Sequence, residues 1–270
     1  PLYPEESTSW NEALIPSVDY VSDTCLALPK LNLQFLTLTD YLARNFHLFR
    51  LEATYEIRED IQDVCERLLP RANVSGVTQF KGWARMALPL SSFKLYKVGR
   101  PLLGETAPSE VRAEATLSLA GCRADVASEW SALKKHDVVF LLTIRAAVNE
   151  GGAVDASLPM PQRLGLVRVR GGEVTQISDE SGNTFTGESE TDRSLKGSIR
   201  KIELQLDCAQ YHVDAQAMAA GECDDVYAEL NVIVRRRAKE NNFKPILQSI
   251  RDLMTSQLVV PAAAQAPTPQ

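Results

Sequence analysis

The sequence lacks closely spaced cysteines and histidines. Its five cysteines are scattered and form no CxxC or CxC motif, whereas a disulfide scaffold or a zinc ribbon is built from close pairs. The three histidines, His47, His136 and His212, form no HxxxH pair. The sequence therefore predicts reduced thiols and no metal site.

Long hydrophobic runs and an excess of positive charge are also missing. The longest apolar run, residues 138–144, has the length of a strand, far below the ~18 residues of a membrane-spanning helix. The 29 basic residues face 35 acidic ones, which gives a net charge of −6. The short apolar runs argue against a membrane partner. The charge balance argues against a general nucleic-acid coat protein, but it leaves room for a local basic patch.

Motifs of nucleotide-binding and catalytic sites are absent as well. The segment from Gly99 to Thr106 has the spacing of a phosphate loop, but Glu105 stands where that loop needs a lysine. None of the histidines lies in a recognisable protease setting. The acidic residues Glu56, Glu59, Asp60 and Asp63 are typical of the solvated face of a helix. We expect no catalytic residue, no cofactor site and no metal site.

A helical pattern occupies residues 37–70. Apolar residues recur every three or four positions from Leu38 to Leu68. Thr37 and Asp40 predict a capped start, and Pro70 predicts the end. Such a helix is roughly 48 Å long, so we expect it to protrude from a compact domain or to brace another one. Residues 1–36 are expected to form an extended lead-in.

Period-two alternation dominates residues 78–238, where two short helices, at 123–135 and 208–220, interrupt the expected strands. Gly171-Gly172 predicts a hairpin between strands at 164–170 and 173–178. The expected fold class is mainly β with helices (α+β). It is an antiparallel β-barrel flanked by a long N-terminal stalk helix and a C-terminal stalk helix.

The second stalk helix is expected at residues 242–258, before a disordered tail at 259–270. Its apolar stripe consists of Phe243, Ile246, Leu247, Ile250, Leu253 and Met254. Because the first helix is too long for the barrel alone, we expect the second helix to pair with it along this stripe.

Basic residues at strand ends are the best binding signal. The candidate RNA-binding residues are Arg235, Arg237, Lys239, Arg168 and Arg170, and the competing interpretation is ordinary solvated surface charge.

The orientation of these arginines follows from the expected strand at 226–234. Its even positions are apolar and should face the barrel interior, so Arg235 and Arg237 should point outward. Arg236 should point towards the core, where a carboxylate or water must meet its charge. Trp10, Trp83 and Trp130 are expected to be core anchors rather than base-stacking platforms.

Five long and unusual segments stand out along the chain. They are LPKLNLQFLTLTDYLARNFHLFRLEATYEIR at 28–58, GWARMA at 82–87, KKHDV at 134–138, GLVRVRG at 165–171 and KENNFK at 239–244. In this order they resemble the Aquarius family of intron-binding spliceosomal helicases. The resemblance covers nearly the whole chain between Leu2 and Pro261, whereas the loop at 149–161 and the terminal tail diverge.

The resemblance implies a piece of an ATP-dependent RNA helicase that binds introns in the spliceosome, in the nucleus. It implies a non-catalytic stalk and β-barrel module, preceded by an armadillo-type domain and followed by two RecA-like ATPase domains. The implied partners are intron RNA, those domains and spliceosomal proteins, with ATP and magnesium bound outside this chain. The alternative is a protein-interaction platform that docks splicing factors without direct RNA contact.

Overall fold

The protein is described by a computed structural model over residues 1–16, 35, 37–147, 152, 155–188, 194–237, 240 and 242–256. Most of the predicted lead-in, residues 17–34, lies outside these residues, as do Lys239 and the predicted tail at 259–270.

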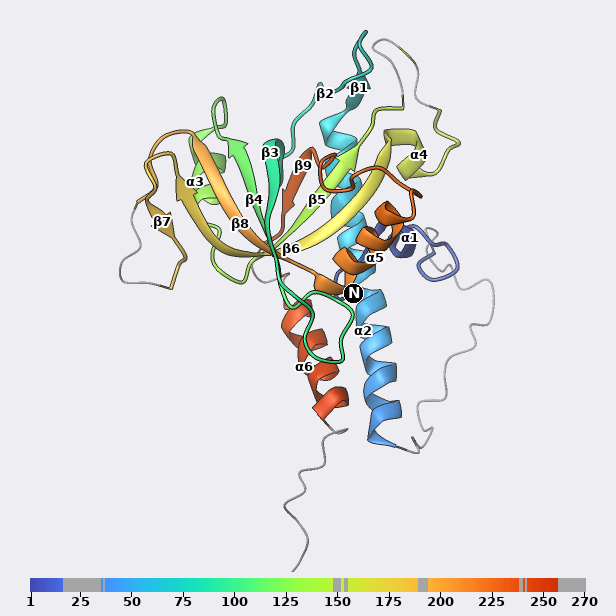
Figure 1. Ribbon diagram of the computed structural model, residues 1–270. Coiled ribbons are helices and arrows are strands. Elements are labelled where there is room, and N and C mark those ends of the chain that lie inside the picture. The colour runs from blue at the N-terminus through green and yellow to red at the C-terminus, as the bar shows by residue number, and fades with distance from the viewer. Residues whose placement is uncertain are drawn as a thin grey trace, which may run out of the picture.

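The long helix α2 extends over Leu38–Leu68. The Thr37 hydroxyl accepts a hydrogen bond of 3.1 Å from the backbone N–H of Asp40 and so caps the first turn, as predicted. After α2 the chain forms a small two-stranded sheet of β1 (Pro70–Ala72) and β2 (Thr78–Phe80). Figure 1 shows that the upper half of α2 lies against the large sheet and that its lower half continues below it.

The other strands of the described residues form one antiparallel sheet. Its strands pair in the order β5-β9-β3-β4-β8-β6, with β7 at the far edge of β6, and β6 also pairs with β5. The pairing therefore returns to its starting strand, which agrees with the predicted class of an antiparallel β-barrel flanked by helices. The strands are β3 (Ala87–Val98), β4 (Val111–Ser118), β5 (Val138–Ile144), β6 (Leu166–Asp179), β7 (Thr184–Phe185), β8 (Ile199–Leu206) and β9 (Val232–Arg235).

The predicted hairpin at Gly171-Gly172 is wrong. Both glycines lie within the continuous strand β6, which pairs with β5 through its first half and with β8 through its second half. A Cβ atom at Gly171 would lie 2.2 Å from Cγ of Tyr3, and one at Gly172 would lie 3.1 Å from a methyl group of Leu206. These glycines therefore permit a close approach of neighbouring side chains, which the sequence signal of a turn does not distinguish.

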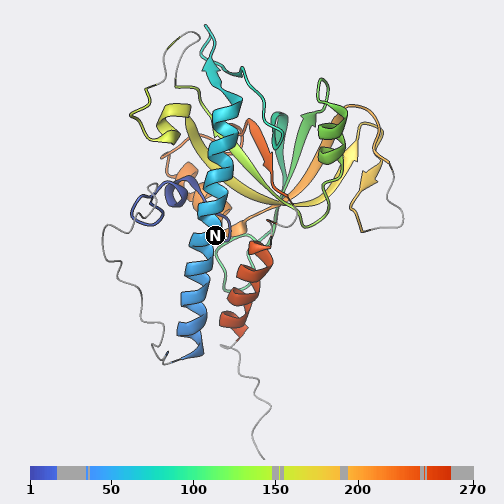
Figure 2. The same cartoon turned by 180° about the vertical axis from the view of Figure 1, so that it is seen from behind.

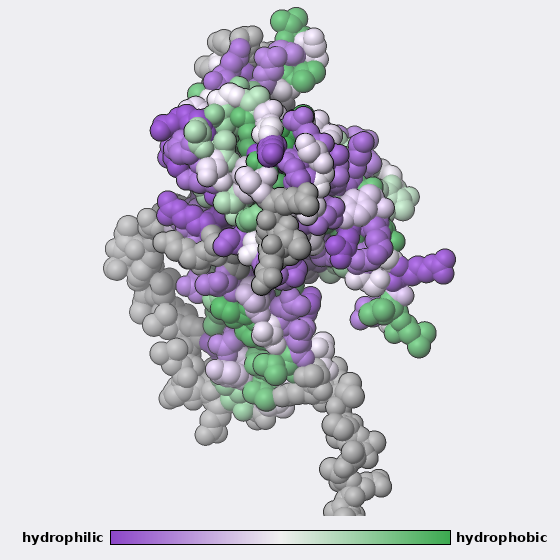
Figure 3. All heavy atoms as spheres, turned by 90° about the vertical axis from the view of Figure 1, so that its left-hand side faces the viewer, coloured by the Kyte–Doolittle hydropathy of each residue, from purple (hydrophilic) through white to green (hydrophobic). Residues whose placement is uncertain are grey.

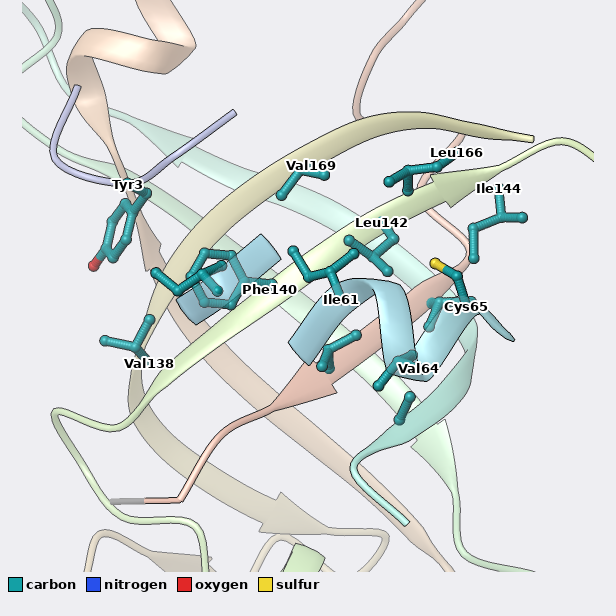
Figure 4. Packing of buried hydrophobic residues seen from close by; sticks show 14 of the residues in the cluster. Tyr3, Ile61, Val64, Cys65, Val138, Phe140, Leu142, Ile144, Leu166 and Val169 are labelled. Carbon is teal, nitrogen blue, oxygen red and sulfur yellow. The ribbon is translucent and has the colours of Figure 1, made fainter. Parts of the chain in front are cut away.

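Strand β5 separates two hydrophobic cores. Its even-numbered residues belong to the core that includes α2, whereas Val139 and Leu141 belong to the core of the barrel interior. Figure 4 shows Phe140 and Leu142 in the cluster with Ile61 of α2. Because both faces of β5 are covered, all its residues are buried, as the apolar run predicted.

Strand β9 is shorter than predicted, and its two faces are reversed. It spans Val232–Arg235 rather than residues 226–234. Val232 and Val234 lie in the core with α2, whereas Ile233 lies in the barrel interior. The prediction failed because α2 covers the outer face of the strand. Both faces are then apolar, and alternation alone does not identify the inner one.

Helix α6 (Phe243–Ser256) packs beside α2, and we call these two helices the stalk. Figure 2 shows them side by side below the sheet. The predicted pairing is confirmed, but the predicted stripe is only partly buried. Phe243 and Leu247 lie in the core with α2, whereas Ile246 and Leu253 are 43% and 53% exposed. Figure 3 shows hydrophobic residues at the surface of this lower part of the molecule.

The remaining helices of the described residues are short. They are α1 (Glu6–Ser9), α3 (Ala124–Ser131), α4 (Met160–Leu164) and α5 (Cys208–Ala219), of which α3 and α5 are the predicted insertions. Trp130 on α3 is fully buried in the barrel core, and Trp10 is partly buried against the core of α2. The expectation of a core anchor is wrong for Trp83, whose side chain is 63% exposed.

Candidate nucleic-acid interface

The three consecutive arginines at the end of β9 lie in three different environments. Arg235 shares the face of Ile233 and is only 11% exposed. Its guanidinium pairs with Glu129 of α3 and lies 5.7 Å from the centre of the Trp130 ring. Burial lowers the pKa of Arg235, and Glu129 opposes that effect. The predicted outward orientation of Arg235 is therefore wrong.

Arg236 points towards α2 and is almost fully buried. Its Nε donates to a carboxylate oxygen of Asp60 at 2.6 Å, and Nη1 donates to the carbonyl oxygen of Glu240 at 2.9 Å. A second carboxylate, that of Glu56, lies 3.8 Å from Nη2. A carboxylate does meet this buried charge, as predicted, but the long helix supplies it.

Arg237 is the most accessible of the candidate residues that the structure describes. Its side chain is 69% exposed. Its Nη1 atom lies 3.9 Å from a carboxylate oxygen of Glu240, too far for a hydrogen bond. Lys239 lies outside the described residues, so its role stays a prediction.

Arg235 begins a row of alternating charges that we call the ion-pair chain, formed by Arg235, Glu129, Arg85, Asp125 and Arg123. Arg85 bridges the two acids, with Nη2 at 2.5 Å from Glu129 and Nη1 at 3.1 Å from Asp125. Arg123 extends the chain at 3.3 Å from Asp125. Three arginines face two carboxylates, so one positive charge remains.

The arginines of the ion-pair chain lower the pKa of both of its acids, Glu129 and Asp125, and so keep them ionised. The hydrogen bond from the Arg85 guanidinium lowers the pKa of Glu129, and the same hydrogen bond raises the pKa of Arg85. The partly exposed chain therefore carries fixed charges at neutral pH, and its two end groups, Arg235 and Arg123, are both cations.

Arg168 and Arg170 belong to a different region, where β6 meets α1 and α5. Arg170 donates to both carboxylate oxygens of Asp214 at 2.7 Å and to Glu6 at 2.7 Å, and it is 5% exposed. Tyr227 also donates to Asp214, at 2.8 Å. Arg168 pairs with Glu6 at 3.1 Å and is 30% exposed.

This buried network occupies the charge of Arg170. Burial acts to lower the pKa of its guanidinium, but the bonds to Asp214 and Glu6 outweigh burial and raise it. A phosphate could reach Arg170 only by breaking these bonds, which leaves Asp214 unpaired in the core. The network thus ties the N-terminal segment to the barrel.

Sequence reasoning missed Arg85 and Arg123. Both are isolated in the sequence, so no charge run marks them. One signal could have found them. Asp125 and Glu129 stand four residues apart on one face of a predicted helix, and two like charges in this arrangement are stabilised by nearby cations.

Several other sites can be judged from the described residues. They contain no group of three or more His, Cys, Asp or Glu side chains placed to hold a metal ion. None of the helices they form is both long and apolar enough to cross a bilayer. The segment with phosphate-loop spacing leads from β3 into β4, with a bridge between Pro101 and Pro108, whereas a phosphate loop opens a helix.

Comparison with known proteins finds similarity over the stalk and the barrel. The family model described as "Intron-binding protein aquarius, beta-barrel" matches residues 69–236. The chain is also 46% identical over 261 residues to a Mus musculus protein named "RNA helicase aquarius". This match covers 97% of the chain but only 18% of the mouse protein, so the chain spans less than a fifth of that relative.

Proposed function

The chain belongs to the Aquarius family of intron-binding proteins, and on that basis we propose that it is the non-catalytic stalk and β-barrel module of an ATP-dependent RNA helicase that binds introns in the spliceosome. The observation that carries the proposal is the 46% identity, which extends over nearly the whole chain, barrel and stalk alike. A nuclear location and a role in pre-mRNA splicing follow from the same proposal.

In this role the barrel contacts intron RNA, and the stalk joins the barrel to the RecA-like and armadillo domains of the same protein. Helix α2 has 31 residues, about 46 Å, and its lower half extends beyond the barrel with α6. The exposed Ile246 and Leu253 give this pair an apolar surface that suits attachment to another domain.

ATP and magnesium belong, in this proposal, to the motor domains outside this chain. The segment with phosphate-loop spacing carries Glu105, whose carboxylate repels phosphate, and it runs into a strand. The module therefore acts by shaping the RNA path and by supporting the motor.

A second candidate function is a platform that docks spliceosomal proteins without direct RNA contact. The observation that favours it is the state of the predicted RNA-binding arginines. Arg235 and Arg170 are both buried in ion pairs, so neither offers a free charge to phosphate.

Salt-dependent RNA binding distinguishes the two functions, and Arg237 is the residue to test. If Arg237 contacts a phosphate, Arg237→Gln weakens binding of single-stranded RNA to the chain and reduces the log–log salt slope by about 0.7. The matched control is Arg251→Gln on α6. Arg251 is 47% exposed and lies 3.7 Å from one carboxylate, that of Asp252, much as Arg237 lies near Glu240.

The outcomes separate cleanly. A smaller slope in Arg237→Gln alone supports RNA contact at this end of the barrel. Equal slopes in wild type and both variants remove Arg237 from the contact, and a wild-type chain that binds no RNA favours the protein-docking platform.

A further inference from the structure

Trp83 is a large aromatic residue held in solvent by a rigid backbone. Gly82 donates its N–H to the Leu68 carbonyl at 3.0 Å, and a Cβ atom at Gly82 would lie 1.9 Å from the Arg67 carbonyl oxygen. On the other side, Ala84 is buried and forms a β-bridge to Ala87. The 63% exposure of the Trp83 side chain is therefore imposed by its anchored neighbours.

A pocket of ≈ 400 Å³ opens beside this tryptophan, within the size range of small-ligand sites. One of the lining residues is Gly121, where an added Cβ atom would meet nothing within 4 Å, so this part of the wall has no side chain and a flat group can approach the backbone closely. The wall is otherwise mostly apolar and includes Leu68, Phe80, Pro89 and Val126.

The edge of the pocket is positively charged. Arg123, the exposed end of the ion-pair chain, lines it with a side chain that is 74% exposed. The ion-pair chain carries one excess positive charge, because three arginines face two carboxylates. An aromatic face beside a cation is the combination with which proteins bind single-stranded nucleic acid, because a base stacks on the ring while the cation attracts its phosphate.

We propose that Trp83 and its pocket bind an unpaired nucleobase of single-stranded RNA, with Arg123 attracting the adjoining phosphate. The inference rests on the proposed RNA contact and adds a site for it that lies apart from the arginines after β9. Since every base has a stacking face, the site discriminates little between sequences. A binding surface of this kind holds an RNA strand and lets it slide.

Indole N–H signals in nitrogen-15 spectra of the 270-residue chain test the site directly, because the chain has three tryptophans and the other two are partly or fully buried. Trp83→Phe assigns the signal. An eight-nucleotide oligoadenylate is expected to shift the Trp83 signal and leave Trp130 in place, whereas inorganic polyphosphate, which has no bases, leaves the Trp83 signal in place.

Affinity measurements with the same oligoadenylate complete the test. Trp83→Ala is expected to bind about tenfold more weakly, because one stacked base is lost. Its salt slope should be unchanged, because the substitution removes no phosphate contact. Arg123→Gln should lower the slope instead. The control is Leu103→Ala, which removes another exposed apolar side chain, outside the pocket, and should change neither affinity nor slope.

The failures are distinguishable. If wild type binds the oligoadenylate and Trp83→Ala binds it equally well, the base site is wrong and the pocket is left to a protein segment, while the proposed RNA contact stands. If the wild-type chain binds no oligoadenylate, the base site and the RNA contact fail together.

Discussion

Replacing Leu247 by alanine tests how the stalk is held together. Leu247 is fully buried in the core that α6 shares with α2, whereas Ile246, the residue before it, is 43% exposed. A buried Leu→Ala change costs about 2–5 kcal/mol because it loses apolar burial and leaves a cavity. Leucine and alanine are both good helix formers, so the difference in helix propensity offsets little of this cost.

Thermal unfolding of the chain, followed by circular dichroism, measures the difference. A loss of about 3 kcal/mol in a chain of this size lowers Tm by roughly 6–12 °C. Ile246→Ala is the matched control and should change the free energy of unfolding by less than about 1 kcal/mol. Equal midpoints for Leu247→Ala and wild type, or a larger effect at Ile246, would refute this packing of α6 against α2.

Two further predictions concern buried charges. Burial raises the pKa of Glu173, but Lys244 and His136 outweigh burial and hold it below its ordinary value of 4.5. This carboxylate therefore adds stability above that pH, and the stability is lost as pH falls below 4.5 towards the folded pKa. The stability gap between wild type and Glu173→Gln should accordingly shrink over that range, and a constant gap in urea unfolding would contradict it. Arg170→Met should cost about 3–5 kcal/mol, because Asp214 is left buried and unpaired. Adding Asp214→Leu should restore part of that loss, and a further loss in the double variant would contradict the network.

The fold class could be predicted from the sequence because its signals are long and local. The 3.6-residue period of α2 and the apolar run of β5 each persist over many residues, and each produced the expected element. The pairing of α6 with α2 followed from the excess length of the first stripe. These arguments need no knowledge of distant neighbours.

What failed depends on neighbours that are far away in the sequence. Arg235 meets Glu129 from 106 residues away, and Arg236 meets Asp60 from 176 residues away. The face of β9 that lies inside the barrel could not be identified, because α2 makes the outer face apolar as well. Any rule based on local sequence predicts a turn at Gly171. The actual reason for a glycine there is the ring of Tyr3, which packs where a Cβ atom would lie.

The candidate site was found only in part for the same reason. A run of three arginines is visible in the sequence. The sequence does not show that one of them faces the barrel, the second faces the long helix and the third faces solvent. Trp83 fits neither a period of two nor one of 3.6 residues, so no periodicity predicts its exposure. That exposure is set by Gly82 before it, which packs against the backbone of Arg67, and by the buried Ala84 after it.

The separation of the two stalk helices along the chain has a consequence for synthesis. About 175 residues lie between the end of α2 and the start of α6. At ~5–20 residues per second a ribosome needs roughly 10–35 s to make that stretch. For that time the apolar face on the lower half of α2 has emerged without its partner helix. A chaperone that recognises exposed amphipathic helices is therefore expected to meet the nascent chain in this interval, before the stalk closes.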